Sequence, residues 1–118
     1  MPDGIRRLPA AVPSGRTGPA RHEMPAVDEA ALEAARRADR LLATAREIGA
    51  DRWIAYLEPL AERLRDDGPR DLRQAALRAR AAYGPKDSIR DVLPAELTGP
   101  FLDAVDRLLK VLNRREVA

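Results

Sequence analysis

The sequence predicts an all-α fold: four main helices forming a small bundle, preceded by a disordered N-terminal tail. Apolar residues recur every three or four positions in four long segments, which is the period of an amphipathic helix. No segment alternates apolar and polar residues with period two, and the aromatic residues that favour strands make up only 3% of the chain. Because the turns between the helical segments are short, we expect neighbouring helices to pack roughly antiparallel.

The first 26 residues differ from the rest in composition. They hold five of the ten prolines and three of the seven glycines, with no periodic apolar pattern. Such a segment buries too little apolar surface to offset the entropy of ordering it. We therefore predict a disordered Pro/Arg-rich tail over residues 1–26 and one helical domain over residues 27–118. Two origins of the tail stay open: a native segment, or a mis-assigned start or cloning remnant upstream of Met24.

The first helix is expected to begin near Asp28, an acceptable N-cap, and to end at Gly49. Its apolar stripe holds Val27, Ala31, Ala34, Ala35, Ala38, Leu41, Leu42, Ala45 and Ile48. Alanine dominates the first half of this stripe, which buries little area per residue and is expected to be the least securely held part. A poorly filled face gains from a second copy of the chain, so the sequence also predicts a homodimer through it.

The second helix is expected to begin with a cap at Asp51, and Pro59 inside it predicts a kink or a short break. The third helix is expected to start at Arg70 or Asp71 and to end at Gly84. The apolar positions of the two helices are Trp53, Ile54, Leu57, Leu60, Ala61 and Leu64, then Leu72, Ala75, Ala76, Ala79, Ala82 and Tyr83.

A long connection leads to the last helix. Ser88 or Asp87 is expected to cap a short turn over residues 89–93, and Pro100 suits the first turn of the final helix. The apolar positions of that helix are Phe101, Leu102, Val105, Leu108, Leu109 and Leu112, after which fraying is expected. The connection over residues 84–100 is long enough to break a simple up-and-down topology.

The composition removes several classes of function. Without cysteine the chain has no disulfide, thiolate nucleophile or cysteine-based metal site. The single histidine, His22, lies in the predicted tail, which removes Ser-His catalysis and most zinc chemistry. Acidic pairs such as Asp66-Asp67 have simple roles at helix ends. We predict that the chain is not an enzyme and uses no cofactor or metal.

Charge and hydropathy bear on location and partners. The tail carries four arginines against two acids, whereas residues 27–118 hold 17 basic and 17 acidic residues. A neutral domain lacks the basic footprint that phosphate binding needs. No apolar run approaches the ~18 residues of a membrane span, and no secretory signal is recognisable. We expect a cytoplasmic protein without membrane contact, and the preference for arginine over lysine is typical of a GC-rich bacterial genome.

Two stretches of the sequence carry a resemblance to a known family. They are DRWIAYL, residues 51–57, and AYGPKDSIRD, residues 82–91. They are similar to a bacterial family of short uncharacterised proteins, a domain of unknown function. In that family an Ala/Leu-rich helix precedes a tryptophan-bearing helix, and an aromatic-Gly loop ends in Ser-(Ile/Leu)-x-Asp. The resemblance spans residues 32–93 and implies an α-helical domain without an assigned activity.

The loop after the third helix is the most distinctive local chemistry. It offers hydrogen-bond donors and acceptors of both charges on a backbone restricted by Gly-Pro, which suits a partner-docking surface. Its candidate residues are Tyr83, Lys86, Asp87 and Arg90. The structural alternative is a helix C-cap followed by an N-cap, with Asp91 or Arg90 joining the loop to a neighbouring helix.

Trp53 and Tyr56 are the other candidates for binding a partner. An exposed Trp-Tyr-Arg cluster has the composition of an interface hot spot. The structural alternative places Trp53 in the core and leaves Tyr56 to cover the edge of its helix.

We therefore predict a non-enzymatic protein-interaction module of a bacterium: an immunity- or antitoxin-like, accessory or regulatory protein. The alternative is a nucleic-acid-binding regulator that uses the helix around Arg70–Tyr83. In a helix-turn-helix, Arg73 and Arg80 would lie seven residues apart on one face, toward phosphate. The neighbouring Asp66, Asp67 and Asp71 oppose that role, and a solvated arginine face is the structural alternative.

Overall fold

The computed structural model describes residues 20–85 and 87–117, with the side chains of residues 115–117 left aside. Four α-helices and two single turns of 3-10 helix make up this part of the chain. In order they are η2 Arg21–Glu23, α1 Pro25–Ile48, α2 Asp51–Asp66, α3 Pro69–Ala81, η3 Ile89–Asp91 and α4 Ala95–Val117. No strand occurs within these ranges, so the predicted all-α class is confirmed.

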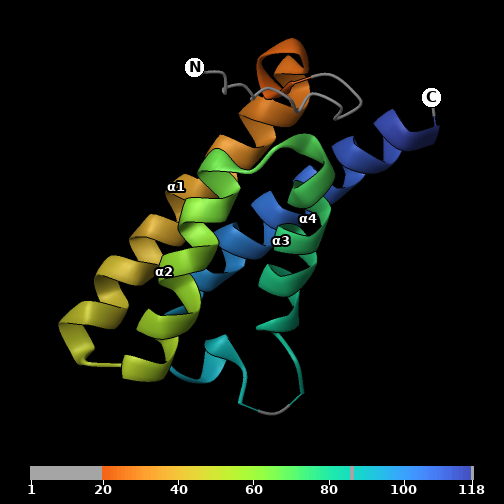
Figure 1. Cartoon of the computed structure of the whole chain (residues 1–118). Helices are drawn as coiled ribbons and strands as arrows, with labels where there is room; N and C mark the ends of the chain where they lie inside the picture. The colour runs from red at the N-terminus through yellow and green to blue at the C-terminus, as the bar shows by residue number, and fades with distance from the viewer. Residues whose placement is uncertain (1–19, 86, 118) are drawn as a thin grey trace, which may run out of the picture.

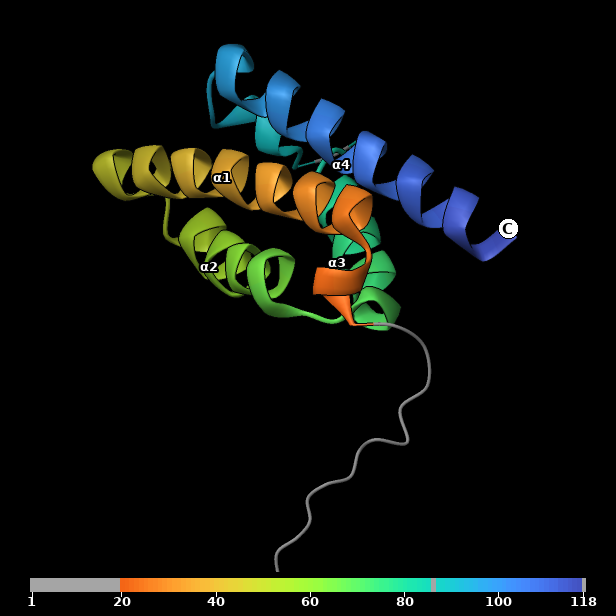
Figure 2. The ribbon, with the colours of Figure 1, turned by 90° about the horizontal axis from the view of Figure 1, so that it is seen from above.

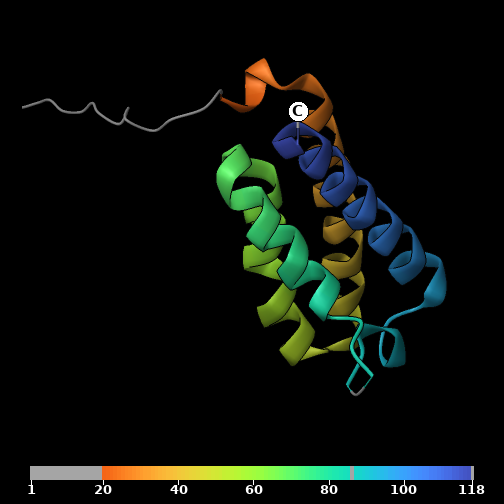
Figure 3. The same ribbon diagram turned by 90° about the vertical axis from the view of Figure 1, so that its right-hand side faces the viewer.

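The four helices run alternately up and down, and each lies beside the next in the sequence (Figure 1). Seen from above, α1 lies between α2 and α4 (Figure 2). α3 packs against α4 and, less extensively, against α2, which runs beside it in the opposite direction (Figure 3). The long connection joins the end of α3 to the beginning of α4 at the same end of the bundle, so the up-and-down topology is kept (Figure 1).

The predicted apolar stripes form one continuous core, with few exceptions. Ile54, Tyr83 and Leu102 are only half-buried. Ile48, the last residue of α1, is 55% exposed, because α1 ends there and no neighbouring helix covers it. The core prediction is therefore accurate at most positions inside the helices, partly correct at these three half-buried ones, and wrong at Ile48.

The alanine-rich half of α1 is fully buried within the chain itself. Val27, Ala31 and Ala34 have no exposed surface, and the other alanines of the predicted stripe are equally enclosed. The small side chains allow α2 and α4 to approach α1 closely. The face on which the homodimer was predicted is therefore covered within the chain, and the weaker hold on this half stays a prediction.

The folded part begins earlier than predicted, with η2 and a buried Met24, and α1 begins at Pro25 instead of at an Asp28 cap. The side chain of Arg21, only 11% exposed, forms an ion pair of 2.8 Å with Asp28. Its guanidinium also donates to three main-chain oxygens at the end of α2: Leu64 (2.9 Å), Arg65 (2.7 Å) and Asp67 (3.1 Å). Residues 20–26 thus belong to the packed part, while the remainder of the predicted tail, residues 1–19, lies outside the described residues.

Helices α1 and α2 meet at a turn that was partly predicted. Gly49 adopts the left-handed conformation with φ of 69° and ends α1 as expected. Asp51 is the first residue of α2 and not its cap, which is Ala50. α2 continues through Pro59 without a break, and the proline lies on the exposed side of the helix.

Helices α3 and α4 are both longer at their amino ends than predicted. α3 begins at Pro69, because proline fits the first turn of a helix, where no amide hydrogen is needed. α4 begins at Ala95, and Pro94 accepts its first hydrogen bonds from Leu97 and Thr98, each at 3.0 Å. Pro100 therefore lies inside α4, and the helix continues to Val117.

Candidate functional site

Trp53 belongs to the core. Its side chain is 3% exposed, and its ring meets the ring of Tyr56 edge-on, with 5.4 Å between the centroids. The guanidinium of Arg52 lies 4.7 Å from the centre of the indole ring. The structural alternative for Trp53 is therefore the correct one, and the exposed hot spot around it does not form.

Tyr56 bridges α2 and α3. Its hydroxyl donates to the main-chain oxygen of Arg78, and the guanidinium of Arg78 lies 4.6 Å from the centre of its ring. Partial burial raises the pKa of this phenol, against the opposing effect of the nearby arginines. The side chain covers a helix edge, as the structural alternative predicted.

Tyr83 bridges the loop after α3 and the beginning of α4. Its hydroxyl donates to the main-chain oxygen of Thr98, and Arg90 covers its ring with 5.1 Å between guanidinium and ring centre. Burial raises the pKa of this phenol far above its ordinary value, with smaller contributions from the charges around it. Tyr83 is thus half-buried and engaged within the chain.

The rest of this loop contains the predicted helix cap. The hydroxyl of Ser88 accepts from the amide of Arg90 at 3.1 Å, and the amide of Ser88 donates to the carboxylate of Asp91 at 3.2 Å. Asp91 therefore closes the cap locally, while Arg90 reaches Tyr83. Asp87 is exposed, with a strained φ of 53°, and Lys86 lies outside the described residues.

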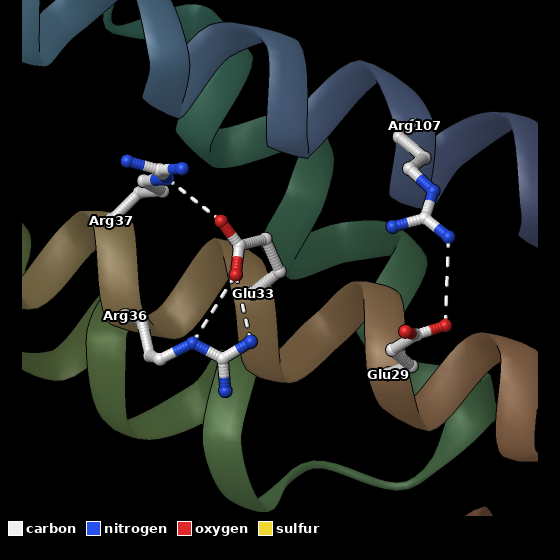
Figure 4. A network of polar contacts seen from close by, with 5 residues as sticks. All are labelled: Glu29, Glu33, Arg36, Arg37 and Arg107. Atoms are coloured by element: carbon white, nitrogen blue, oxygen red, sulfur yellow. Dashed lines mark hydrogen bonds and ion pairs between the residues drawn. The ribbon is translucent and has the colours of Figure 1, made fainter.

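Charged side chains on α1 form a local network (Figure 4). Glu33 pairs with Arg36 and Arg37, each at 2.7 Å, and Glu29 pairs with Arg107 of α4 at 3.5 Å. Hydrogen bonds from Arg36 and then Arg37 hold the pKa of the Glu33 carboxyl below its ordinary value. Each glutamate is paired with at least one arginine here, so charges of both signs are interspersed on this face.

A hollow of about 320 Å³ lies between α3 and α4. We call it the α3–α4 groove, and its lining residues are Arg73, Leu77, Arg80, Asp106, Leu109, Lys110 and Asn113. Leu77 is 50% exposed, whereas Leu109 is 8% exposed. Arg80 and Asp106 form an ion pair of 3.4 Å across the groove. The structure thus combines exposed apolar surface with charged side chains from two helices.

Of the residues that line the groove, Arg73 and Arg80 were predicted from the sequence as candidate contacts with nucleic acid, and the others were not predicted as part of a site. Leu77 lies off the apolar stripe of α3, between the two arginines, where a single exposed leucine is too ordinary to mark a site in the sequence. The α4 residues could not be assigned to the same site from sequence, because their position depends on how α4 packs against α3.

The structure also bears on metal and membrane binding. Within residues 20–85 and 87–117, no group of three or more His, Asp or Glu side chains is placed to hold a metal ion. In the same part of the chain, no helix has the length and apolar character that crossing a membrane requires.

Comparison of the chain with protein-family models, with curated proteins and with solved structures finds no match. The resemblance to a bacterial domain of unknown function therefore stays a prediction, and the function is argued from the surface of this chain alone.

Proposed function

We propose that this chain is a non-enzymatic protein-interaction module of the bacterial cytoplasm, an immunity- or antitoxin-like, accessory or regulatory protein. It acts by occupying a protein partner through the α3–α4 groove. The observation that carries the proposal is Leu77, a half-exposed leucine within a hollow rimmed by charged side chains. Fully burying a leucine is worth about 1.5–3 kcal/mol, so covering its exposed half supplies part of that to a complex.

The composition of the groove fits the anatomy of a protein interface. Such interfaces place apolar side chains at the centre and polar ones at the rim. Leu77 and Leu109 supply the centre, while Arg73, Lys110 and Asn113 belong to the rim. The rim charges give register and association rate more than affinity. Asp87 and Arg90, both exposed in the loop beyond α3, stay as secondary candidates for contact.

The test compares two glutamate substitutions at apolar side chains of similar exposure. Leu77→Glu places a charge in the groove, and Ile48→Glu places one at the far end of α1, outside it. The tagged full chain is used to capture partners from cells that make it, with and without nuclease, and the captured proteins are identified by mass spectrometry. We expect one dominant partner that survives nuclease, is retained by Ile48→Glu and is lost with Leu77→Glu. Equal capture by both variants would contradict the proposal.

Nucleic-acid binding is the second candidate, and one observation favours it. Three cationic side chains, those of Arg73, Arg80 and Lys110, line the same hollow. Two observations weigh against it: Arg80 is paired with Asp106, and α2 and α3 run side by side as bundle neighbours instead of crossing steeply like a helix-turn-helix pair. This candidate predicts binding of a labelled DNA duplex that weakens roughly fortyfold between about 50 and 200 mM salt, as three phosphate contacts would give.

A further inference from the structure

We infer that the partner presents an acidic amphipathic helix to the α3–α4 groove. The inference rests on the proposed function and deepens it by stating the chemistry of the occupant. It requires one apolar side chain that covers Leu77 and carboxylates that face the cations beside it.

The apolar contact has a defined place. Leu77, Ile48 and Val92 are the large apolar side chains most exposed in the described part of the chain. Of these three, Leu77 is the one that lines the groove, where it shares the surface with the nearly buried Leu109. An occupant therefore gains most when its own apolar side chain lies over Leu77.

The charge of the groove sets the sign of the occupant. Its lining holds three cations and one carboxylate, and that carboxylate, Asp106, is already paired with Arg80. Lys110 has no ion pair among the described residues. Arg73 lines the same hollow and has an interaction of its own within the chain, so Lys110 is the cation on which the charge preference rests. An acidic side chain is favoured at this end of the groove, and a basic one is repelled.

The spacing of the lining residues favours a helix as the occupant. Arg73, Leu77 and Arg80 lie four and three residues apart on α3, and Asp106 to Asn113 on α4 also spans seven residues. Seven residues of helix correspond to about 10 Å. A groove of this length accepts about two turns of a third helix, with contacts at i and i+3 or i+4. The occupant thus carries its carboxylate one turn from its apolar anchor.

The experiment selects helical peptides on the folded full chain from a display library with randomised charge. The selected peptides are then measured by fluorescence anisotropy against two charge-reversal variants. Lys110→Glu reverses a cation in the groove, and Arg40→Glu reverses an exposed cation on α1, outside it. We expect selected peptides with carboxylates at i+3 or i+4 from an apolar residue, binding roughly tenfold weaker to Lys110→Glu and within about twofold of wild type to Arg40→Glu.

Several results would overturn the inference. They are a basic or uncharged consensus, the absence of any enriched peptide, and equal binding to Lys110→Glu and wild type. A dimer in sedimentation that Leu77→Glu dissociates would also overturn it, because a second copy would then be the occupant. If the partner captured from cells still depends on Leu77, the interaction module stands and only the acidic helix fails. If the captured partner does not depend on Leu77 and no acidic peptide is selected, both proposals fail.

Discussion

The two flanks of α3 are closed in different ways. On the α2 side, α3 packs less extensively than on the α4 side, and the seam is bridged by Tyr56, which reaches the main chain of Arg78. On the α4 side, the hydroxyl of Tyr83 reaches the main chain of Thr98, but Leu77 is left half exposed, whereas Leu72 on the same helix is fully buried in the core. Toward α2, the tyrosine that bridges the seam is hydrogen-bonded within the chain. Toward α4, Leu77 leaves apolar surface exposed to solvent. Stability and recognition are therefore expected to separate along a single helix.

The largest expected effect tests this separation with one residue type on one helix. Leu72 has no exposed surface, so Leu72→Ala is expected to lower the free energy of unfolding by about 2–5 kcal/mol, through lost burial and a cavity. Leu77→Ala is expected to change it by less than about 1 kcal/mol, because half of that side chain is already in water. Urea denaturation followed by circular dichroism measures both. Similar losses would show that the α4 flank has no separate outer surface.

The tyrosines give the next largest effect and compare the two seams directly. Tyr83→Phe removes the donor to Thr98, a residue buried in α4, and is expected to cost about 1–2 kcal/mol. Tyr56→Phe removes the donor to Arg78, which is exposed, so water can replace the lost bond and the cost is expected to stay below about 1 kcal/mol. Both substitutions keep the aromatic ring beneath its arginine. The same urea experiment decides, and a larger loss for Tyr56→Phe would reverse the ranking.

The difference between the flanks also marks what the sequence could predict. The period of the apolar residues in α3 correctly placed Leu72, Ala75, Ala76 and Ala79 in the core, because burial follows directly from helical spacing. The role of Leu77 escaped, since one exposed leucine is ordinary in a sequence and becomes informative only beside the α4 residues. Contacts between helices depend on the packing of the bundle, which the spacing within one helix does not contain.

The positions of the helix ends were also predicted only in part from local sequence rules. Gly49 and Ser88 behaved as predicted, because a left-handed helix end and a side-chain cap involve only neighbouring residues. The beginning of the fold did not, since Arg21 is fixed by main-chain oxygens more than forty residues away. An arginine in a proline-rich stretch has no sequence signal for such a contact. Pro100 was wrongly predicted to lie in the first turn of the last helix. Proline is tolerated inside α4, so its position did not mark the start of that helix.

The smallest expected effect is the response of each seam to alkaline pH. Burial raises the pKa of both phenols above the ordinary value of about 10, and the effect is larger for Tyr83. Above pH 10 the unfolded chain therefore releases protons that the folded chain keeps, so stability is retained below that pH and falls as the pH rises further. Urea midpoints between about pH 9 and 11, followed by the fluorescence of the buried Trp53, measure this loss.

A comparison of the two Tyr→Phe variants shows which seam, α2–α3 or α3–α4, causes this loss of stability. Tyr83→Phe is expected to remove the larger part of the alkaline slope, because the phenol held neutral by burial is gone, while Tyr56→Phe removes a smaller part. Titration of lysine contributes equally to both variants and to wild type, so it cancels in the comparison. If Tyr56→Phe flattened the slope more than Tyr83→Phe, the α2 seam would be the better shielded of the two. The solvent-exposed surface between α3 and α4 would then extend from Leu77 to Tyr83, next to the loop that carries Asp87 and Arg90.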